Sequence, residues 1–306
     1  MTKKNFFVCI LSICLLSILS FSCAVMGAVG DVASVIGEIT DNPVLASAGK
    51  ATSSVAEASA PISAEQEYYI GRSVAASILG SYDVYENNVL TEYVNKVCQV
   101  LVINSGREEL FKGYSVAILD SDQINAFATS GGHIFVTRGL VSCAESEDAL
   151  AAVVAHEIAH VQLKHGVKAI KSDRWTDAAL ASAGAALNAL SEGEMNEVVE
   201  SFDESVNSIV STMVNTGYSQ SQEYEADALA LEIMDSAGYN PAAMTKMLTQ
   251  LQEKQPKSSG GFAKTHPSAE KRLSKVKKEL KEYEEISIPD IRQKRFDAAM
   301  ESFDSI

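Results

Sequence analysis

A pair of histidines four residues apart constrains this chain more than any other feature. His156 and His160 flank Glu157 in the run His-Glu-Ile-Ala-His, within a stretch of helical character from Glu147 to Val167. Four residues advance an α-helix by about 400°, so the two imidazoles lie about 40° apart on one face and can hold one zinc ion. Glu157 is offset by one residue and lies beside the ion, where its carboxylate can take a proton from zinc-bound water. The motif therefore predicts a helix that carries a hydrolytic zinc site.

Zinc in a hydrolytic site needs a third protein ligand and an open fourth position. A histidine six residues after His160 is one option for the third ligand, but Gly166 occupies that position. His165 comes one residue earlier, about 140° around the same helix from His160, so it does not face the same ion. We expect His165 to pack beside the site or to contact a ligand from behind.

A carboxylate on a later helix is the other option for the third ligand. Glu223 and Asp227 are four residues apart, so they share one face of the helix expected from Glu223 to Ala237. Glu223 would bind the ion, and Asp227 would accept an N–H from a ligand histidine and so fix its tautomer. Glu225 points to another side of this helix, and we expect solvent around it.

Further motifs, in a fixed order along the chain, resemble those of the Ste-type, HtpX-type and BepA-type zinc endopeptidases of peptidase family M48. The matching runs are Asn125-Ala126-Phe127-Ala128, Gly131-Gly132, Thr137-Arg138-Gly139-Leu140, His156 to His160, Glu223 to Asp227, Ala237-Gly238-Tyr239-Asn240-Pro241, and Thr265-His266-Pro267 with Arg272. Together they cover residues 63–285. The resemblance implies a zinc-dependent endopeptidase that acts on proteins. It implies that the base is Glu157 and that the ligands are His156, His160 and Glu223.

The resemblance also implies roles for residues beside the zinc ion. A substrate strand would border the cleft and pair with the main chain of an extended substrate, which tolerates many sequences; its residues are Asn125, Ala126, Phe127 and Ala128. His266 would lie near the ion, where it could steady an oxyanion or occupy the open metal position in a resting state. A purely structural role for the loop of His266 is the alternative.

Other parts of the chain allow more than one interpretation. Arg272 could pair with an active-site carboxylate or remain a solvated charge on a helix. Residues 172–218 could form a helical lid over the cleft or pack as an ordinary part of the fold. His133, in the expected hairpin, is predicted to lie at the surface.

The chain departs from the family pattern at two places near the site. Ser219-Gln220 stands where the family has Ser-Arg before the third ligand, and Ser130 stands where the family has Pro before Gly-Gly. Neither change alters a ligand or the base. The HtpX and Ste branches carry several membrane helices, and BepA-like proteins carry a C-terminal repeat domain. Neither feature is expected in this chain, so we place it in a small, soluble, extracytoplasmic branch.

The first residues have the composition of a secretory leader. Two lysines precede an uncharged run that is strongly apolar as far as Phe21. Cys23 follows a small residue, as in a lax lipobox, so we expect residues 1–22 to be a lipoprotein leader and Cys23 to carry the lipid. Ordinary cleavage near Ala24 or Ala28 and a retained membrane anchor are the alternatives. All three place the body outside the cytoplasm, in the bacterial cell envelope or periplasm.

Charge and cysteine content limit the partners. The chain has 25 Lys and Arg against 40 Asp and Glu, a formal net charge of -15, whereas a nucleic-acid binder needs a basic face. We therefore expect no nucleic acid. Anionic lipid repels an acidic body, so membrane contact would come through the N-terminal lipid anchor. Cys98 and Cys143 could form a disulfide in an oxidising compartment or remain two buried thiols.

The order of elements indicates an α+β, mostly helical fold. Helices are expected over residues 64–79, 90–104, 147–167, 195–214, 223–237, 241–253 and 267–285, with a strand at 114–119 and a hairpin of 125–129 with 133–137. With the resemblance, this predicts a zincin domain of the gluzincin kind, whose active-site helix packs against a small sheet. The expected divisions are a leader (1–22), a flexible tether (23–62), a zinc metallopeptidase domain (63–285) and a C-terminal tail (286–306).

Two functions fit these features. The first is a zinc endopeptidase that hydrolyses misfolded or unassembled cell-envelope proteins. The second is an envelope chaperone or assembly factor that binds unfolded chains and whose peptidase site is latched or rarely used. The exchange Glu157→Gln distinguishes them, because it should keep zinc and substrate binding while it abolishes cleavage.

Overall fold

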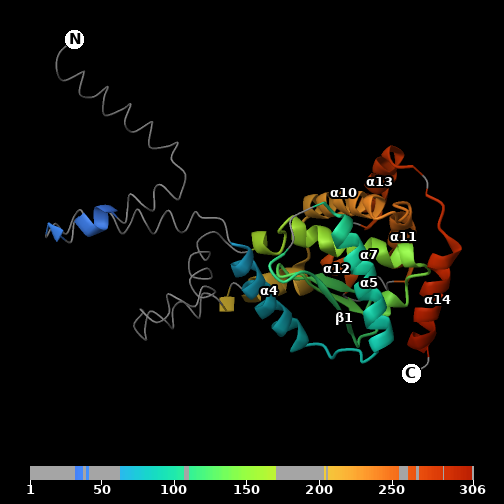
Figure 1. Ribbon diagram of the computed structural model, residues 1–306, viewed down its shortest axis with the longest axis horizontal. Helices are drawn as coiled ribbons and strands as arrows, with labels where there is room; N and C mark the ends of the chain where they lie inside the picture. Colours follow the sequence, from blue (N-terminus) through green and yellow to red (C-terminus); the bar gives the residue numbers. More distant parts are fainter. Residues whose placement is uncertain are drawn as a thin grey trace, which may run out of the picture. The chain divides into compact units, whose positions relative to one another are not determined.

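The computed structural model describes residues 32–36, 39–40, 63–106, 110–169, 203–204, 206–254, 261–266, 269–284 and 286–304. The chain divides into two compact units, Met1–Ile62 and Ser63–Ile306, and the second carries the sheet and the helices labelled in Figure 1. The leader, Cys23 and most of the expected lid lie outside the described residues, so those expectations stay predictions. Among the described residues, no helix combines the length and the apolar character needed to cross a bilayer.

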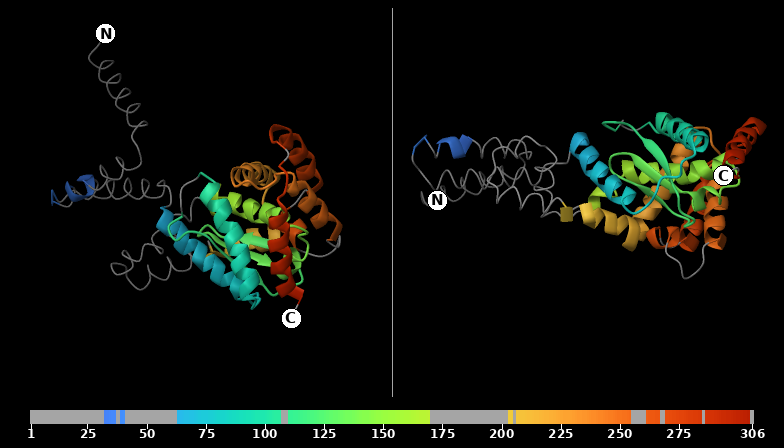
Figure 2. Two further views of the ribbon diagram at one scale, coloured as in Figure 1. Left: turned by 45° about the vertical axis from the view of Figure 1, so that its right-hand side comes forward. Right: turned by 90° about the horizontal axis from the view of Figure 1, so that it is seen from below.

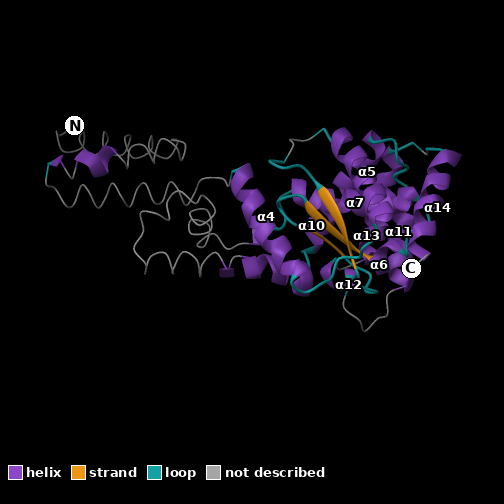
Figure 3. Ribbon diagram, turned by 60° about the horizontal axis from the view of Figure 1, so that its bottom comes forward, coloured by secondary structure: helices purple, strands orange, loops and turns teal. Residues whose placement is uncertain are grey.

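Three strands form the sheet, in the order β1-β3-β2. β1 (Ser115–Leu119) runs parallel to β3 (His133–Thr137), and β2 (Ala126–Ala128) runs antiparallel to β3. The predicted hairpin is therefore present, and Gly132 in its turn takes a left-handed conformation (φ 80°) that favours glycine. Figures 2 and 3 show that helices surround this small sheet.

Side-chain amides of one helix close the outer edge of β1. The helix is α5 (Asn88–Asn104), which packs against β1. Asn95 donates to the carbonyl of Val116 at 2.7 Å and accepts from the N–H of the same residue at 2.9 Å. Gln99 donates to the carbonyl of Tyr114 at 3.0 Å. These bonds satisfy backbone groups that a bare edge strand would leave unpaired.

The helix that carries the histidine motif, α7 (Glu147–Gln162), is buried along nearly its whole length. Apolar residues lie on all its faces, as is typical of a helix inside a core. It packs against β2, β3 and α5 and, most extensively, against α10 (Gln220–Ser236), as Figure 1 shows. The helix ends before the predicted Val167, because the chain leaves the helical path and Lys164 takes a left-handed conformation (φ 57°).

The remaining elements complete the helical part of the fold. α4 (Ala64–Leu79) begins with the predicted capping box, in which Ser63 accepts from the N–H of Gln66. The others are α6 (Arg138–Val141), the 3-10 turn η1 (Val167–Ala169), the π-helical turn η4 (Thr212–Thr216), α11 (Ala243–Lys254), α12 (Phe262–Thr265), α13 (Ala269–Glu279) and the 3-10 turn η5 (Leu280–Glu282). The fold is α+β and mostly helical, which confirms the predicted class.

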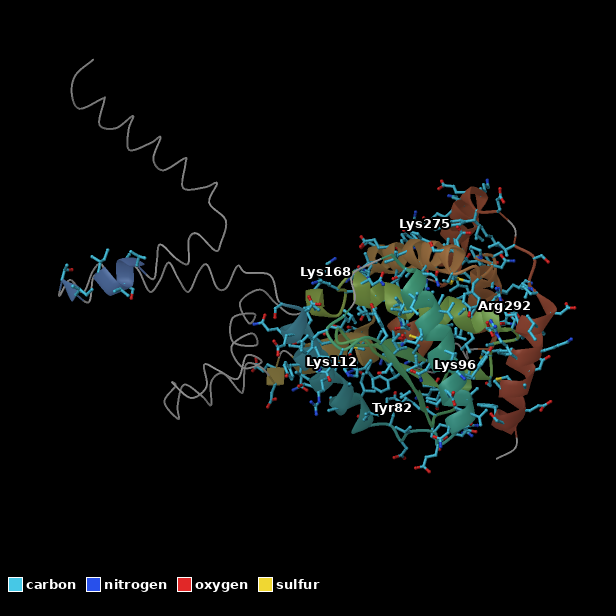
Figure 4. All side chains as sticks on the ribbon, in the orientation of Figure 1. Tyr82, Lys96, Lys112, Lys168, Lys275 and Arg292 are labelled. Atoms are coloured by element: carbon cyan, nitrogen blue, oxygen red, sulfur yellow. The ribbon has the colours of Figure 1, made fainter. Side chains whose placement is uncertain are left out.

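The C-terminal segment assigned to a tail contains a helix, α14 (Asp290–Asp304), which packs against α5 and α7. Arg292 reaches toward the body of the fold (Figure 4), and its Nη1 donates to Asp148 Oδ1 at 2.8 Å. Arg295 forms an ion pair with Glu147. Both carboxylates are buried in the first turn of α7. The arginines of α14 compensate this buried charge, which ties the end of the chain to the core.

Cys98 and Cys143 are both buried and free. Burial raises the pKa of both thiols, that of Cys98 to about 12. The sequence allowed either a disulfide or two buried thiols for this pair, and the structure contains two buried thiols.

Asn95→Ala should lower the free energy of unfolding by about 1–3 kcal/mol, because Val116 would lose the partners of a backbone N–H and carbonyl. Asn104→Ala is the matched control, since Asn104 lies on the same helix and bonds the carbonyl of Val100 at an exposed position. The control should change stability by less than about 0.5 kcal/mol. Urea unfolding measures both variants, and equal effects would show that the amide of Asn95 does not stabilise the strand edge.

Candidate metal centre

Four buried side chains from three separate parts of the chain meet at one point. His156 and His160 come from α7, Glu223 comes from the first turn of α10, and His266 is the C-cap residue that follows α12. One ligand atom of each residue lies within 4.8 Å of the other three, an arrangement that could hold a metal ion. All four residues had been selected from the sequence.

The separations of these atoms fit a tetrahedral ion. His156 Nε2 lies 3.0 Å from His160 Nε2 and 3.3 Å from His266 Nδ1. Glu223 Oε1 lies 3.4 Å from His160 Nε2 and 3.1 Å from His266 Nδ1. Zinc bonds of about 2.0–2.1 Å place tetrahedral ligand atoms about 3.3–3.4 Å apart. Imidazole nitrogens and carboxylate oxygens are donors that zinc takes in proteins, so both the donor set and its spacing fit this ion.

Behind the ligand atoms, a buried arginine joins two carboxylates of α10. Arg272 Nη1 lies 2.8 Å from Glu223 Oε2, and the same guanidinium donates to Asp227 from Nε at 2.8 Å and from Nη2 at 2.7 Å. Asp227 Oδ1 lies 3.1 Å from His156 Nδ1. Arg272 thus pairs with carboxylates of the site, which was one of its two interpretations. Asp227 lies where it can accept an N–H from a ligand histidine.

Burial and charge together set the protonation states at this point. Burial raises the pKa of Asp227, but the charge and hydrogen bonds of Arg272 and the hydrogen bond with His156 together lower it to about 2. Burial also opposes ionisation of Glu223, yet His266 and Arg272 hold the pKa of that carboxyl well below its ordinary value. Burial lowers the pKa of His160 well below its ordinary value and so favours a neutral imidazole. Burial and Arg272 lower the pKa of His156, but its hydrogen bonds with Asp227 and Glu223 outweigh them and raise it to about 9. The two ionised carboxylates are therefore opposed by Arg272 and by a proton on His156, and a divalent cation at this point would take the place of that proton.

Glu157 lies inside the same site. Its side chain is buried, and its Oε1 accepts no hydrogen bond from the described residues; His266 Nε2 is 3.6 Å away. Burial raises the pKa of Glu157 above its ordinary value, and the nearby histidines His266 and His156 offset only part of this effect. A carboxyl group with a raised pKa is suited to exchange protons near neutral pH.

His165 contacts His160 from behind, which was one of the two expectations for this residue. The left-handed turn at Lys164 folds the chain back, and His165 Nδ1 lies 2.9 Å from His160 Nδ1. On its other side, His165 Nε2 lies 3.4 Å from Glu225 Oε2. Glu225 was expected to be solvated; its side chain is 55% exposed, but it contacts this histidine. Periodicity could not identify the pair, because the contact forms beyond the end of the helix.

Two aromatic rings that the sequence did not single out lie against the imidazoles. Tyr218 stacks on His160 with ring centroids 4.1 Å apart and planes 20° apart, and Phe262 stacks on His266 at 4.3 Å and 22°. Both aromatic side chains are buried, so they restrict the orientation of the rings that they cover. Their closeness in sequence to Glu223 and His266 is the signal that could have identified them.

The predicted substrate strand lies at an edge of the sheet, next to the segment that carries His266. All of its residues are buried, namely Asn125, Ala126, Phe127 and Ala128. The N–H of Phe262 donates to the carbonyl of Ile124 at 2.7 Å, and Thr265 Oγ1 donates to Asn125 Oδ1 at 2.9 Å. The α12 segment therefore contacts the start of the edge that was expected to receive a substrate.

Comparison with known proteins supports the resemblance seen in the motifs. Residues 88–280 match the sequence model of Peptidase family M48. The beta-barrel assembly-enhancing protease of Escherichia coli (strain K12) is 28% identical over 224 residues, which cover 71% of this chain and 44% of that protein. Mitochondrial metalloendopeptidase OMA1 of Schizosaccharomyces pombe is 29% identical over 194 residues (63% and 53%), and metalloprotease LoiP of Escherichia coli (strain K12) is 28% identical over 157 residues (50% and 58%). The chain spans about half the length of these curated relatives.

Asp227→Asn should weaken zinc binding by about 10–100-fold, because it removes a charge that faces Arg272 and loosens the orientation of His156. Asp235→Asn is the control, since it makes the same chemical change on the same helix at an exposed position. The zinc affinity of the control should equal that of the wild type. Competition with a chromogenic chelator measures both, and an unchanged affinity in Asp227→Asn would exclude Asp227 from a role in metal binding.

Proposed function

The chain belongs to peptidase family M48, and on this basis we propose that it is a zinc-dependent endopeptidase. In this proposal His156, His160 and Glu223 hold one zinc ion, and Glu157 is the general base. One observation carries it: four buried side chains converge at a spacing that fits zinc. The carboxyl group of Glu157 lies beside them with an oxygen that accepts no hydrogen bond from the described residues.

In this proposal, each side chain of the site has a separate role in peptide hydrolysis. A zinc ion held here would lower the pKa of a bound water to about 7 and polarise the substrate carbonyl. Glu157 takes the proton of the attacking water and passes it to the amine nitrogen that leaves as the peptide C–N bond breaks. Asp227 and Arg272 keep the metal-binding side chains oriented. Because the group is buried, each of these charge interactions is stronger than it would be in water.

His266 closes the site in this arrangement. Its Nδ1 lies 3.3 Å from His156 Nε2 and 3.1 Å from Glu223 Oε1, at the corner that a hydrolytic zinc site leaves open. Hydrolysis therefore requires His266 to move away. This geometry supports occupation of the open position in a resting state more than it supports the role of an oxyanion donor.

Proteins with unfolded or unassembled segments are the substrates that this proposal favours. An edge strand such as β2 pairs with an extended main chain, which unfolded segments present. One relative is named for enhancing the assembly of β-barrels. A leader with Cys23 as lipid attachment site supports a location in the bacterial cell envelope. Together these features support hydrolysis of misfolded or unassembled envelope proteins.

A second function is favoured by the same closed arrangement. If His266 stays in place for most of the time, the protein would act as an envelope chaperone or assembly factor that binds unfolded chains and rarely cleaves them. The contacts of Phe262 and Thr265 with the start of the β2 edge add to the closure of the site.

Glu157→Gln should retain zinc at one ion per chain and lower casein cleavage by at least about 100-fold, because the substitution removes the proton acceptor and leaves the ligands in place. Glu145→Gln, at an exposed position just before α7, is the control and should cleave casein as the wild type does. Metal analysis and cleavage with and without a chelator measure both effects. Chelator-resistant cleavage, or full cleavage by Glu157→Gln, would refute the proposed mechanism.

His266→Ala tests the resting state. Removal of an imidazole that occupies the open metal position should raise casein cleavage severalfold at unchanged zinc content, whereas loss of an oxyanion donor should lower it by about 10²-fold or more. Initial rates of casein cleavage distinguish the two. A fall in rate would contradict occupation of the open position as the main role of His266.

A further inference from the structure

The two ring nitrogens of His160 face different groups. Its Nε2 faces the metal-binding cluster, 3.0 Å from His156 Nε2 and 3.4 Å from Glu223 Oε1. Its Nδ1 faces away from the cluster and lies 2.9 Å from His165 Nδ1. A neutral imidazole that offers the lone pair of Nε2 to a metal carries its proton on Nδ1. The Nδ1–H of His160 therefore needs an acceptor, and His165 Nδ1 lies at hydrogen-bond distance from it.

The imidazole of His165 can then donate a hydrogen bond from its other nitrogen. If His165 accepts at Nδ1, its own proton lies on Nε2, which is 3.4 Å from Glu225 Oε2. The backbone N–H of His165 also donates to the carbonyl of His160 at 3.0 Å. His165 is fully buried, whereas the carboxylate of Glu225 is half exposed. A consistent series of hydrogen bonds thus leads from the buried His160 through His165 to the carboxylate of Glu225 at the surface.

The backbone takes an unfavourable conformation to place this imidazole. Lys164 has φ 57°, a left-handed conformation that is disfavoured for a residue with a side chain. Its Nζ forms an ion pair with Glu67, a buried residue of α4. The N–H of Lys164 donates to the carbonyl of Val161 at 2.9 Å. The turn that presents His165 is therefore held from two sides.

We propose that His165 is a positioning residue for the zinc ligand His160, and that Glu225 in turn orients His165. The inference rests on the proposed zinc site and extends it to two residues outside the histidine motif. The other motif histidine has a comparable partner, because His156 Nδ1 faces Asp227 Oδ1 at 3.1 Å. Residues that orient a ligand from behind typically change metal affinity by about 10–100-fold when they are lost.

Two substitutions of similar size separate hydrogen bonding from packing. In His165→Asn, the amide oxygen can lie where Nδ1 of the imidazole lies, so it can still accept from His160. In His165→Leu, the side chain fills a similar space without an acceptor. Chelator competition should show about 10–100-fold weaker zinc binding for His165→Leu and at most about threefold weaker binding for His165→Asn. Equal zinc affinities for the two variants, whether both strong or both weak, would overturn the inference.

A surface pair provides a test that does not depend on core folding. Glu225→Ala should weaken zinc binding by about threefold or more, whereas Glu232→Ala, at an exposed position of the same helix, should leave it unchanged. Equal zinc affinities for these two variants would show that Glu225 does not orient His165.

The visible spectrum of the cobalt-substituted protein gives a readout independent of activity. It should change in His165→Leu and persist in His165→Asn, because it reports the geometry of the ligands; an unchanged spectrum in His165→Leu would count against a positioning role. Failure of the wild type to bind zinc would refute the proposed function itself. Stoichiometric zinc in the wild type with unchanged binding in His165→Leu would refute only the role of His165.

Discussion

A buried cluster of opposite charges where α7 meets α10 is the constraint on which the rest of this structure depends. Glu223 and Asp227 are both ionised inside the core, where the guanidinium of Arg272 and the protonated imidazole of His156 oppose their charge. An uncompensated buried carboxylate costs several kcal/mol of stability. The three imidazoles of this cluster and Glu223 place their ligand atoms at a spacing that a divalent cation fits, so such an ion can replace the proton of His156. Folding and metal binding are therefore expected to be coupled in this protein.

The burial of α7 on all sides is accompanied by specific contacts at both of its ends. At its start, the carboxylates of Glu147 and Asp148 are paired with arginines of α14. At its end, the left-handed turn at Lys164 brings the imidazole of His165 back against that of His160. The middle of the helix is then free to carry apolar residues on every face, which fixes the motif histidines rigidly against α10.

Helical periodicity and turn chemistry predicted the parts of the site that depend on local structure. They placed His156 and His160 on one face and paired Glu223 with Asp227, and the hairpin was read from its glycines. They left open whether His165 packs beside the site or contacts a ligand from behind, because the contact depends on where the helix ends. They could not reveal the stacking of Tyr218, which depends on packing. The role of α14 was also hidden, since Arg292 and Asp148 are 144 residues apart in the chain. These features depend on contacts between distant segments, and a single sequence carries no periodic signal for them.

The position of the metal itself tests the central claim most directly. Crystals of the wild-type protein grown with zinc should show one anomalous peak at the zinc absorption edge in each chain. The peak should lie about 2.0–2.2 Å from His156 Nε2, His160 Nε2 and one carboxylate oxygen of Glu223. A zinc peak at full occupancy elsewhere in the chain, with these three side chains unligated, would contradict the account.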